Sequence, residues 1–132
     1  MNAYYSIVVD RARGALRIAM GGFFMHSDVD AFQSEVYMKL AQLGLRPNQH
    51  LMLCDVREMK IQMQEIVAAF SHVVGNPRSR SKRLAFVTGS SLSRLQAKRL
   101  SNRDGIAYFA DMALAQAWLF DPAHDAVAIA AE

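Results

Sequence analysis

The segment Thr88–Arg94, TGSSLSR, gathers residue types that could bind an anion. It lies between an apolar run and a helical pattern, and the free amides at a helix N-terminus attract negative charge. Glycine, serine hydroxyls and an arginine at such a turn suit a phosphate or a carboxylate. The spacing is not that of a P-loop, because the required glycine and lysine positions are absent. The candidate ligand- or anion-binding residues are Thr88, Gly89, Ser90, Ser91, Ser93 and Arg94. The alternative is purely structural, with Ser91 or Ser93 capping the helix.

Positive charge is concentrated in the same part of the chain. Eight of the fifteen Lys and Arg residues lie between positions 78 and 103, a stretch that contains no acid. The helix after Ser93 should run antiparallel to the strand before it, so the end of the helix lies near the start of that strand. Most of these cations stand just before the strand or at the end of the helix, and we therefore expect them to form one patch. It could attract an acidic protein, an anionic membrane or nucleic acid. The one aromatic residue of this stretch, Phe86, belongs to the expected strand 84–88 rather than to the charged segments, which favours a solvated face over a nucleic-acid site. The candidate basic patch is Arg78, Arg80, Lys82, Arg83, Arg99 and Arg103.

No catalytic or metal centre can be assembled from the remaining polar residues. The four histidines are far apart in sequence and no pair has metal-ligand spacing. Cys54 lies inside an apolar run, which predicts a buried, inert thiol rather than a nucleophile. Asp55 ends the run LMLCD, and we interpret it as the polar end of a buried strand. We therefore expect no enzymatic activity, no metal and no cofactor.

Size and composition indicate one folded unit in a reducing compartment. The chain has 132 residues, of which 52% are hydrophobic and 20% charged, and this excludes a disordered chain. One cysteine allows no intrachain disulfide, which favours the cytoplasm. The N-terminus does not have the pattern of a signal peptide, and no apolar stretch approaches the ~20 residues that span a bilayer. We expect a single domain over 1–121 and an alanine-rich tail over 122–132, either frayed or packed on a neighbour.

Hydrophobic periodicity predicts an α/β fold built on a single sheet. A β-hairpin over 4–10 and 15–20 is followed by alternating helices and strands, in the order αβαβαβα. The later strands are expected at 51–56, 84–88 and 105–109. The helices are expected after Ser27 up to Gly44, over 63–74, after Ser93, and after the cap Asp111. Such alternation implies right-handed crossovers, so the five-stranded sheet should be mixed and mostly parallel, with about four helices packed on it.

Three segments resemble the SpoIIAA-like family of the STAS domain superfamily, whose fold is the one predicted above. They are LMLCDVREM as a central strand, KRLAFVTG as the next strand, and IAYFADMALAQAWL at the end, within a likeness that covers residues 4–120. In the superfamily, anti-sigma factor antagonists carry a phosphorylatable serine in an Asp-Ser-Ser-Gly segment after the central strand. Here that segment falls on residues 63–66, MQEI, which has no hydroxyl. The resemblance therefore implies the fold without this phosphorylation switch.

Two kinds of binding function remain open. The first is a non-enzymatic regulatory module that binds a partner protein or a second copy of itself as a homodimer. The second is a carrier or sensor of a small amphipathic or anionic ligand, lipid-like or phosphate-bearing, held between helices or at Thr88–Arg94. A third and weaker hypothesis is docking of the basic patch on an anionic surface. We expect no integral membrane segment and no nucleic-acid partner.

Overall fold

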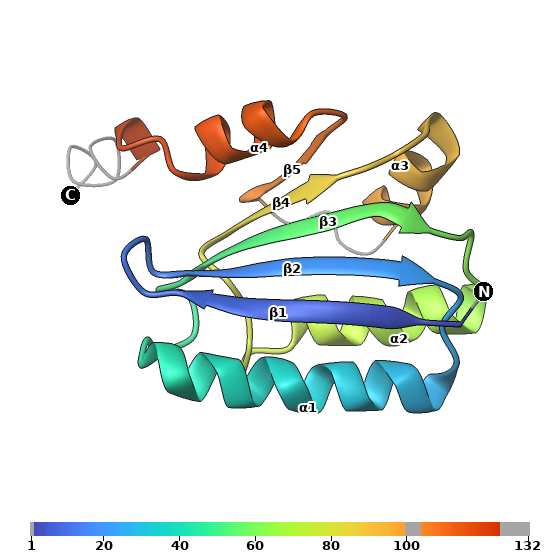
Figure 1. Ribbon diagram of the computed structural model, residues 1–132. Helices are drawn as coiled ribbons and strands as arrows, with labels where there is room; N and C mark the ends of the chain where they lie inside the picture. The colour runs from blue at the N-terminus through green and yellow to red at the C-terminus, as the bar shows by residue number, and fades with distance from the viewer. Residues whose placement is uncertain (1, 100–103, 125–132) are drawn as a thin grey trace.

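The protein, described here by a computed structural model over residues 2–99 and 104–124, folds around a five-stranded sheet (Figure 1). The strand order β1-β2-β3-β4-β5 follows the chain, and four helices pack against the sheet. The predicted α/β class and the predicted order of elements are confirmed. The strands are β1 (Tyr4–Asp10), β2 (Ala15–Gly22), β3 (Leu51–Met59), β4 (Arg83–Val87) and β5 (Ile106–Phe109). The helices are α1 (His26–Leu43), α2 (Gln64–Gly75), α3 (Ser91–Lys98) and α4 (Met112–Leu119).

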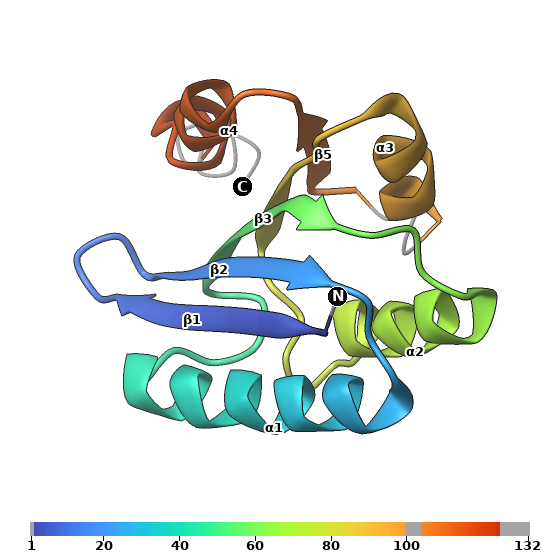
Figure 2. The ribbon, with the colours of Figure 1, turned by 45° about the vertical axis from the view of Figure 1, so that its right-hand side comes forward.

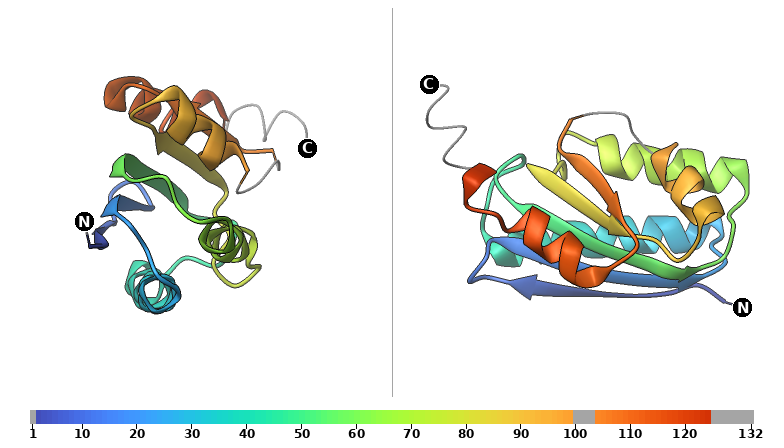
Figure 3. Two further views of the ribbon diagram at one scale, coloured as in Figure 1. Left: turned by 90° about the vertical axis from the view of Figure 1, so that its right-hand side faces the viewer. Right: turned by 90° about the horizontal axis from the view of Figure 1, so that it is seen from above.

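The sheet is mixed in the way the sequence predicts. β1 pairs antiparallel with β2 through the tight hairpin, and every later neighbour is parallel. Each parallel strand is added on the same side of its predecessor, so right-handed crossovers place α1, α2 and α3 on one face. α4 follows the last strand and covers the opposite face, over β3 and β4 (Figure 3).

Strand β3 contributes to both hydrophobic cores, which explains its almost continuous apolar sequence. Successive side chains of a strand point to opposite faces. Cys54 and Val56 belong to the larger core under α1 and α2, whereas Leu51 and Leu53 belong to the smaller core under α4. The prediction that LMLCDV is a buried central strand is confirmed.

Three predicted boundaries are wrong. α1 begins at His26 with Met25 as its N-cap, because the Asp28 carboxylate accepts a hydrogen bond from the Met25 amide at 2.8 Å and makes a Ser27 cap unnecessary. β3 continues past Asp55 to Met59, since its second half still pairs with the end of β2 beyond a bulge. α3 begins at Ser91, two residues before Ser93.

The predicted end of α1 is confirmed. Gly44 adopts a positive φ of 80° and its amide donates to the Leu40 carbonyl, a conformation that glycine reaches without strain. The apolar stripe of α1 faces the sheet, with Val29, Phe32 and Val36 buried. Within the described residues, no helix combines the length and the apolar character needed to cross a bilayer.

Candidate functional site

The Thr88–Arg94 turn uses most of its polar groups internally. Ser90, rather than Ser91 or Ser93, caps α3: its Oγ accepts from the Ser93 amide at 3.1 Å and donates to Ser93 Oγ at 3.0 Å. Thr88 is buried, and its amide donates to the Phe109 carbonyl at 2.8 Å. A Cβ built on Gly89 would lie 2.7 Å from the Arg57 carbonyl oxygen, so this glycine allows two loops to touch. Ser91 and Arg94 are exposed, and an anion site here stays a prediction.

The residues of the predicted basic patch have different environments in the structure: one stacks on an aromatic ring, one is buried and others are exposed. The Arg78 guanidinium stacks over the Tyr37 ring at 4.2 Å, on the α1 side of the molecule. Arg83 is buried, and its Nη2 donates to the Leu119 carbonyl at 3.3 Å under α4. Arg83 is therefore not part of a surface. Arg80, Lys82 and Arg99 are exposed, Arg103 lies outside the described residues, and a surface role for the other members of the patch stays a prediction.

Asp55 points away from α1 and α2 and is engaged by its neighbour along the strand. Arg57 donates to the carboxylate from its amide at 3.1 Å, from Nε at 2.9 Å and from Nη2 at 2.8 Å. These bonds lower the pKa of Asp55, although partial burial opposes the shift. A carboxylate with a lowered pKa in the folded state contributes stability above its unfolded pKa, and this is lost as the pH falls through the folded value. The pair has a local structural role, as the sequence interpretation of Asp55 indicates.

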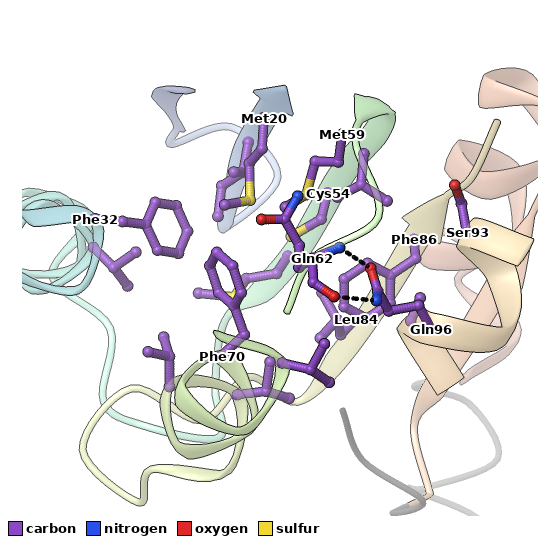
Figure 4. A pocket seen from close by; sticks show the side chains of 18 of the residues that line it. Met20, Phe32, Cys54, Met59, Gln62, Phe70, Leu84, Phe86, Ser93 and Gln96 are labelled. Atoms are coloured by element: carbon purple, nitrogen blue, oxygen red, sulfur yellow. Dashed lines mark hydrogen bonds between the residues drawn. The ribbon is translucent and has the colours of Figure 1, made fainter. Parts of the chain in front are cut away.

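A cavity that sequence analysis did not identify lies between the sheet and helices α1, α2 and α3 (Figure 4). Its volume is about 90 Å³. α2 packs closely on α1 but stands away from the strands, and this leaves the space open. Apolar side chains from the sheet and from all three helices line it, among them Met20, Cys54, Phe86, Phe32, Phe70 and Ala97. No sequence pattern could reveal the cavity, because the same apolar periodicity would equally describe a filled core.

Gln62 closes one end of this cavity by joining three segments. Its Oε1 accepts from the Phe24 amide at 2.8 Å, and its Nε2 donates to the carbonyls of Gly22 and Lys60. Its backbone forms a reciprocal pair with the Gln96 side chain: the Gln62 amide donates to Oε1 and Nε2 donates to the Gln62 carbonyl, both at 3.0 Å (Figure 4). The loop after β3 is thereby fixed to the end of β2 and to α3. A lone glutamine between apolar residues gave no sequence signal for this role.

Cys54 lines the cavity as a buried thiol. Burial, assisted by the nearby Asp55 charge, raises its pKa to about 12, so the reactive thiolate is scarce at neutral pH. We expect a thiol reagent such as a maleimide to label the native protein far more slowly than the urea-unfolded protein. Labelling at equal rates would show that the strand does not bury this residue. The measurement is simple because the chain has a single cysteine.

Large apolar side chains are exposed on both sides of the Gln62–Gln96 contact. Ile61 and Met63 flank Gln62, and Leu92 and Leu95 lie on α3 beside Gln96, all four between 45% and 59% exposed. Figure 2 shows the loop after β3 passing between α3 and α2. We call these four residues the seam surface. The short helix α3 turns only Ala97 fully inward.

The histidine, cysteine and acidic side chains of the described residues do not form a metal site. In residues 2–99 and 104–124, no cluster of three or more His, Cys, Asp and Glu side chains could hold a metal ion. His26 lies 3.9 Å from Glu65 on the surface, and His124 Nε2 lies 2.9 Å from the Trp118 carbonyl oxygen. The arrangement that the described residues best support is a binding site along the seam between α2 and α3.

Comparison with known proteins identifies the fold. No protein-family model matches the chain, and no curated protein matches it. An uncharacterised protein of the DUF3478 family with a SpoIIAA-like fold, from Shewanella loihica PV-4, is 20% identical with a TM-score of 0.70, covering 90% of this chain and 96% of its own. An anti-sigma factor antagonist from Mycobacterium paratuberculosis is 9% identical with a TM-score of 0.61, covering 89% of this chain and 96% of its own. The predicted resemblance is thus confirmed at the level of the fold, and the chain has a SpoIIAA-like fold.

Proposed function

We propose that this chain is a non-catalytic regulatory module that binds another protein through the seam surface. The observation that carries the proposal is the grouping of Ile61, Met63, Leu92 and Leu95, four large apolar side chains exposed on two segments that are hydrogen-bonded together. Isolated apolar residues on a surface are ordinary, but grouped ones mark interaction sites. One neighbour in fold is, by its name, an antagonist of another protein, which agrees with this class of function.

Charge around the seam surface indicates the chemistry of the partner. Lys60 precedes Ile61, and Arg94, Lys98 and Arg99 are exposed on or next to α3. A partner segment with apolar side chains at its centre and acids at its rim would match this arrangement. Each large apolar residue that such a partner buries fully contributes about 1.5–3 kcal/mol, so a few contacts supply most of the affinity. The single buried thiol is compatible with a reducing compartment such as the cytoplasm.

A matched pair of double variants tests the proposal. Leu92→Ser/Leu95→Ser changes the seam surface, whereas Met38→Ser/Leu114→Ser changes two residues of similar exposure, 61% and 62%, on α1 and α4. A protein crosslinked in cells through a photoreactive residue at position 61 would be purified and titrated against each variant. We expect the first variant to weaken its binding by tenfold or more, about 1.4 kcal/mol or above, and the second to leave binding unchanged.

Three results would overturn the proposal. The first is equal affinity of the crosslinked protein for the two double variants, provided that both keep the circular dichroism spectrum of the parent. The second is binding that does not weaken with added salt, because the basic rim would then have no role. The third is crosslinking only to a second copy of the chain, with a mass by light scattering that rises with concentration. That outcome would assign the surface to a homodimer.

A further inference from the structure

The cavity under α2 and α3 is large for a protein interior. Side chains in a core normally pack closely and leave few voids larger than a water molecule. A volume of about 90 Å³ is well above the roughly 10–15 Å³ that a cavity needs to hold one water molecule. The side chains around it are large and ordered by contacts of their own: Phe70 packs edge-on against Phe24 and Phe32 at 5.2 Å and 6.0 Å.

The lining offers an occupant apolar contact rather than hydrogen bonds. The cavity walls are mainly aliphatic, aromatic and thioether groups, including Met20, Met52 and Met59. The amide groups of Gln62 and Gln96 are used within the protein, and Ser79 Oγ donates to the Val73 carbonyl at 3.3 Å. An apolar cavity of this kind does not hold water well and accepts small apolar molecules instead. Methionine side chains adapt their shape to such an occupant.

The exposed part of the lining shows where the cavity opens. Ile18, Val36 and Phe86 at the sheet and α1 are buried, whereas Val67 and Val74 of α2 and Gln96 of α3 are half-exposed. Lys60 is exposed and is the one charged side chain among the lining residues that the structure describes. The opening therefore lies along the seam between α2 and α3, with a cation at the strand-end side.

We infer that this cavity binds a small amphipathic molecule, with an apolar body the size of one ring or a short branched alkyl group between Met20, Phe70 and Phe86. Its polar or anionic end lies at the opening, next to Lys60. The body gains apolar burial and dispersion contacts, and its charge stays outside the low-dielectric interior, where it would be costly. This site is distinct from the seam surface, whose four side chains are exposed and are not part of the cavity lining.

Methionine methyl NMR provides the test, because the methionines report separately on the cavity and on the surface. Protein labelled at the methionine methyl groups would be titrated with toluene, which represents the body alone, and with phenylacetate, which adds a carboxylate. We expect saturable shifts at Met20, Met52 and Met59, which line the cavity, and none at the exposed Met25 and Met38. Shifts confined to exposed methionines, or no saturable shift with either probe, would overturn the inference.

Substitutions of lining residues test whether the two probes bind inside the cavity and where the polar end of the ligand lies. Val67→Phe places a ring in the opening and should lower the affinity for both toluene and phenylacetate by about tenfold or more. Ala97→Ile narrows the opposite wall and serves as a second blocking variant if the first does not fold. Lys60→Gln should lower the affinity for phenylacetate by about two- to fivefold, as expected for the loss of an exposed charge, and should leave the affinity for toluene unchanged. Unchanged phenylacetate affinity in Lys60→Gln would overturn the placement of the polar end.

The test is independent of the proposed docking function. The variant Leu92→Ser/Leu95→Ser, which should weaken partner binding, should leave the toluene shifts at Met20, Met52 and Met59 intact. Loss of these shifts in that variant would show that the probe binds the seam surface instead of the cavity, and would overturn the inference. A protein that binds toluene in the cavity but no partner protein would retain this inference and lose only the docking proposal.

Discussion

Replacing Gln62 with alanine should lower the free energy of unfolding by about 2–4 kcal/mol, although the residue belongs to a loop. The substitution removes the acceptor of the Phe24 amide and the donor to the Gly22 and Lys60 carbonyls. A buried backbone group left without a partner costs about 1–3 kcal/mol, and Gln62 itself is 7% exposed. Urea denaturation followed by circular dichroism measures the change.

Gln64 provides the matched control for this prediction. It is also a glutamine, it lies two residues further on at the start of α2, and it is exposed. Gln64→Ala should change the free energy of unfolding by no more than about 0.5 kcal/mol. Similar denaturation midpoints for the two variants would contradict the role of Gln62 as the residue that joins the loop after β3 to β2.

Gly22→Ala should be the most destabilising single-methyl addition in the region of the site, by about 3 kcal/mol or more. Gly22 has a positive φ of 82°, and a Cβ at this position would overlap the carbonyl oxygen of Asn2. Its own carbonyl accepts from the Lys60 amide at 3.1 Å and from Gln62 Nε2 at 3.0 Å. Any shift of the backbone here therefore also disturbs the loop that carries Ile61 and Met63.

Gly75→Ala adds the same methyl group in a different environment and is the control. Gly75 is the last residue of α2, and a Cβ there meets no heavy atom within 4 Å. The substitution should be neutral or should stabilise by up to about 1 kcal/mol, since alanine favours the helix and restricts the unfolded chain. Thermal unfolding of the two variants compares them directly. Equal melting temperatures would contradict the backbone geometry at the end of β2.

The fold was predictable because local patterns and tertiary burial agree along most of the chain. The apolar run of β3 is buried on both sides, and Asp111 caps α4 by accepting from the Leu114 amide at 3.0 Å, as the acid before MALAQAWL indicates. Hydrophobic periodicity was less informative where contacts with a neighbouring segment determine the end of an element. β3 extends beyond Asp55 because its second half pairs with the end of β2 beyond a bulge, which the local sequence does not show.

The candidate site was less predictable because it depends on distances and contacts between elements that lie far apart in the sequence. The cavity depends on how far α2 stands from the sheet, and hydrophobic periodicity describes which face of a helix is buried but not the distance to its neighbour. Gln62 acts through groups that come from β2, from its own loop and from α3. In α3 only Ala97 is buried, and the exposure of Leu92 and Leu95 depends on how the helix is placed.

The most direct test of the central claim, that the space between the sheet and helices α2 and α3 is a binding site, is a crystal structure obtained in the presence of phenylacetate. We expect electron density for the ring between Met20, Phe70 and Phe86, with the carboxylate directed to Lys60. A structure in which α2 lies against the strands and the protein's own side chains fill the space would contradict the claim.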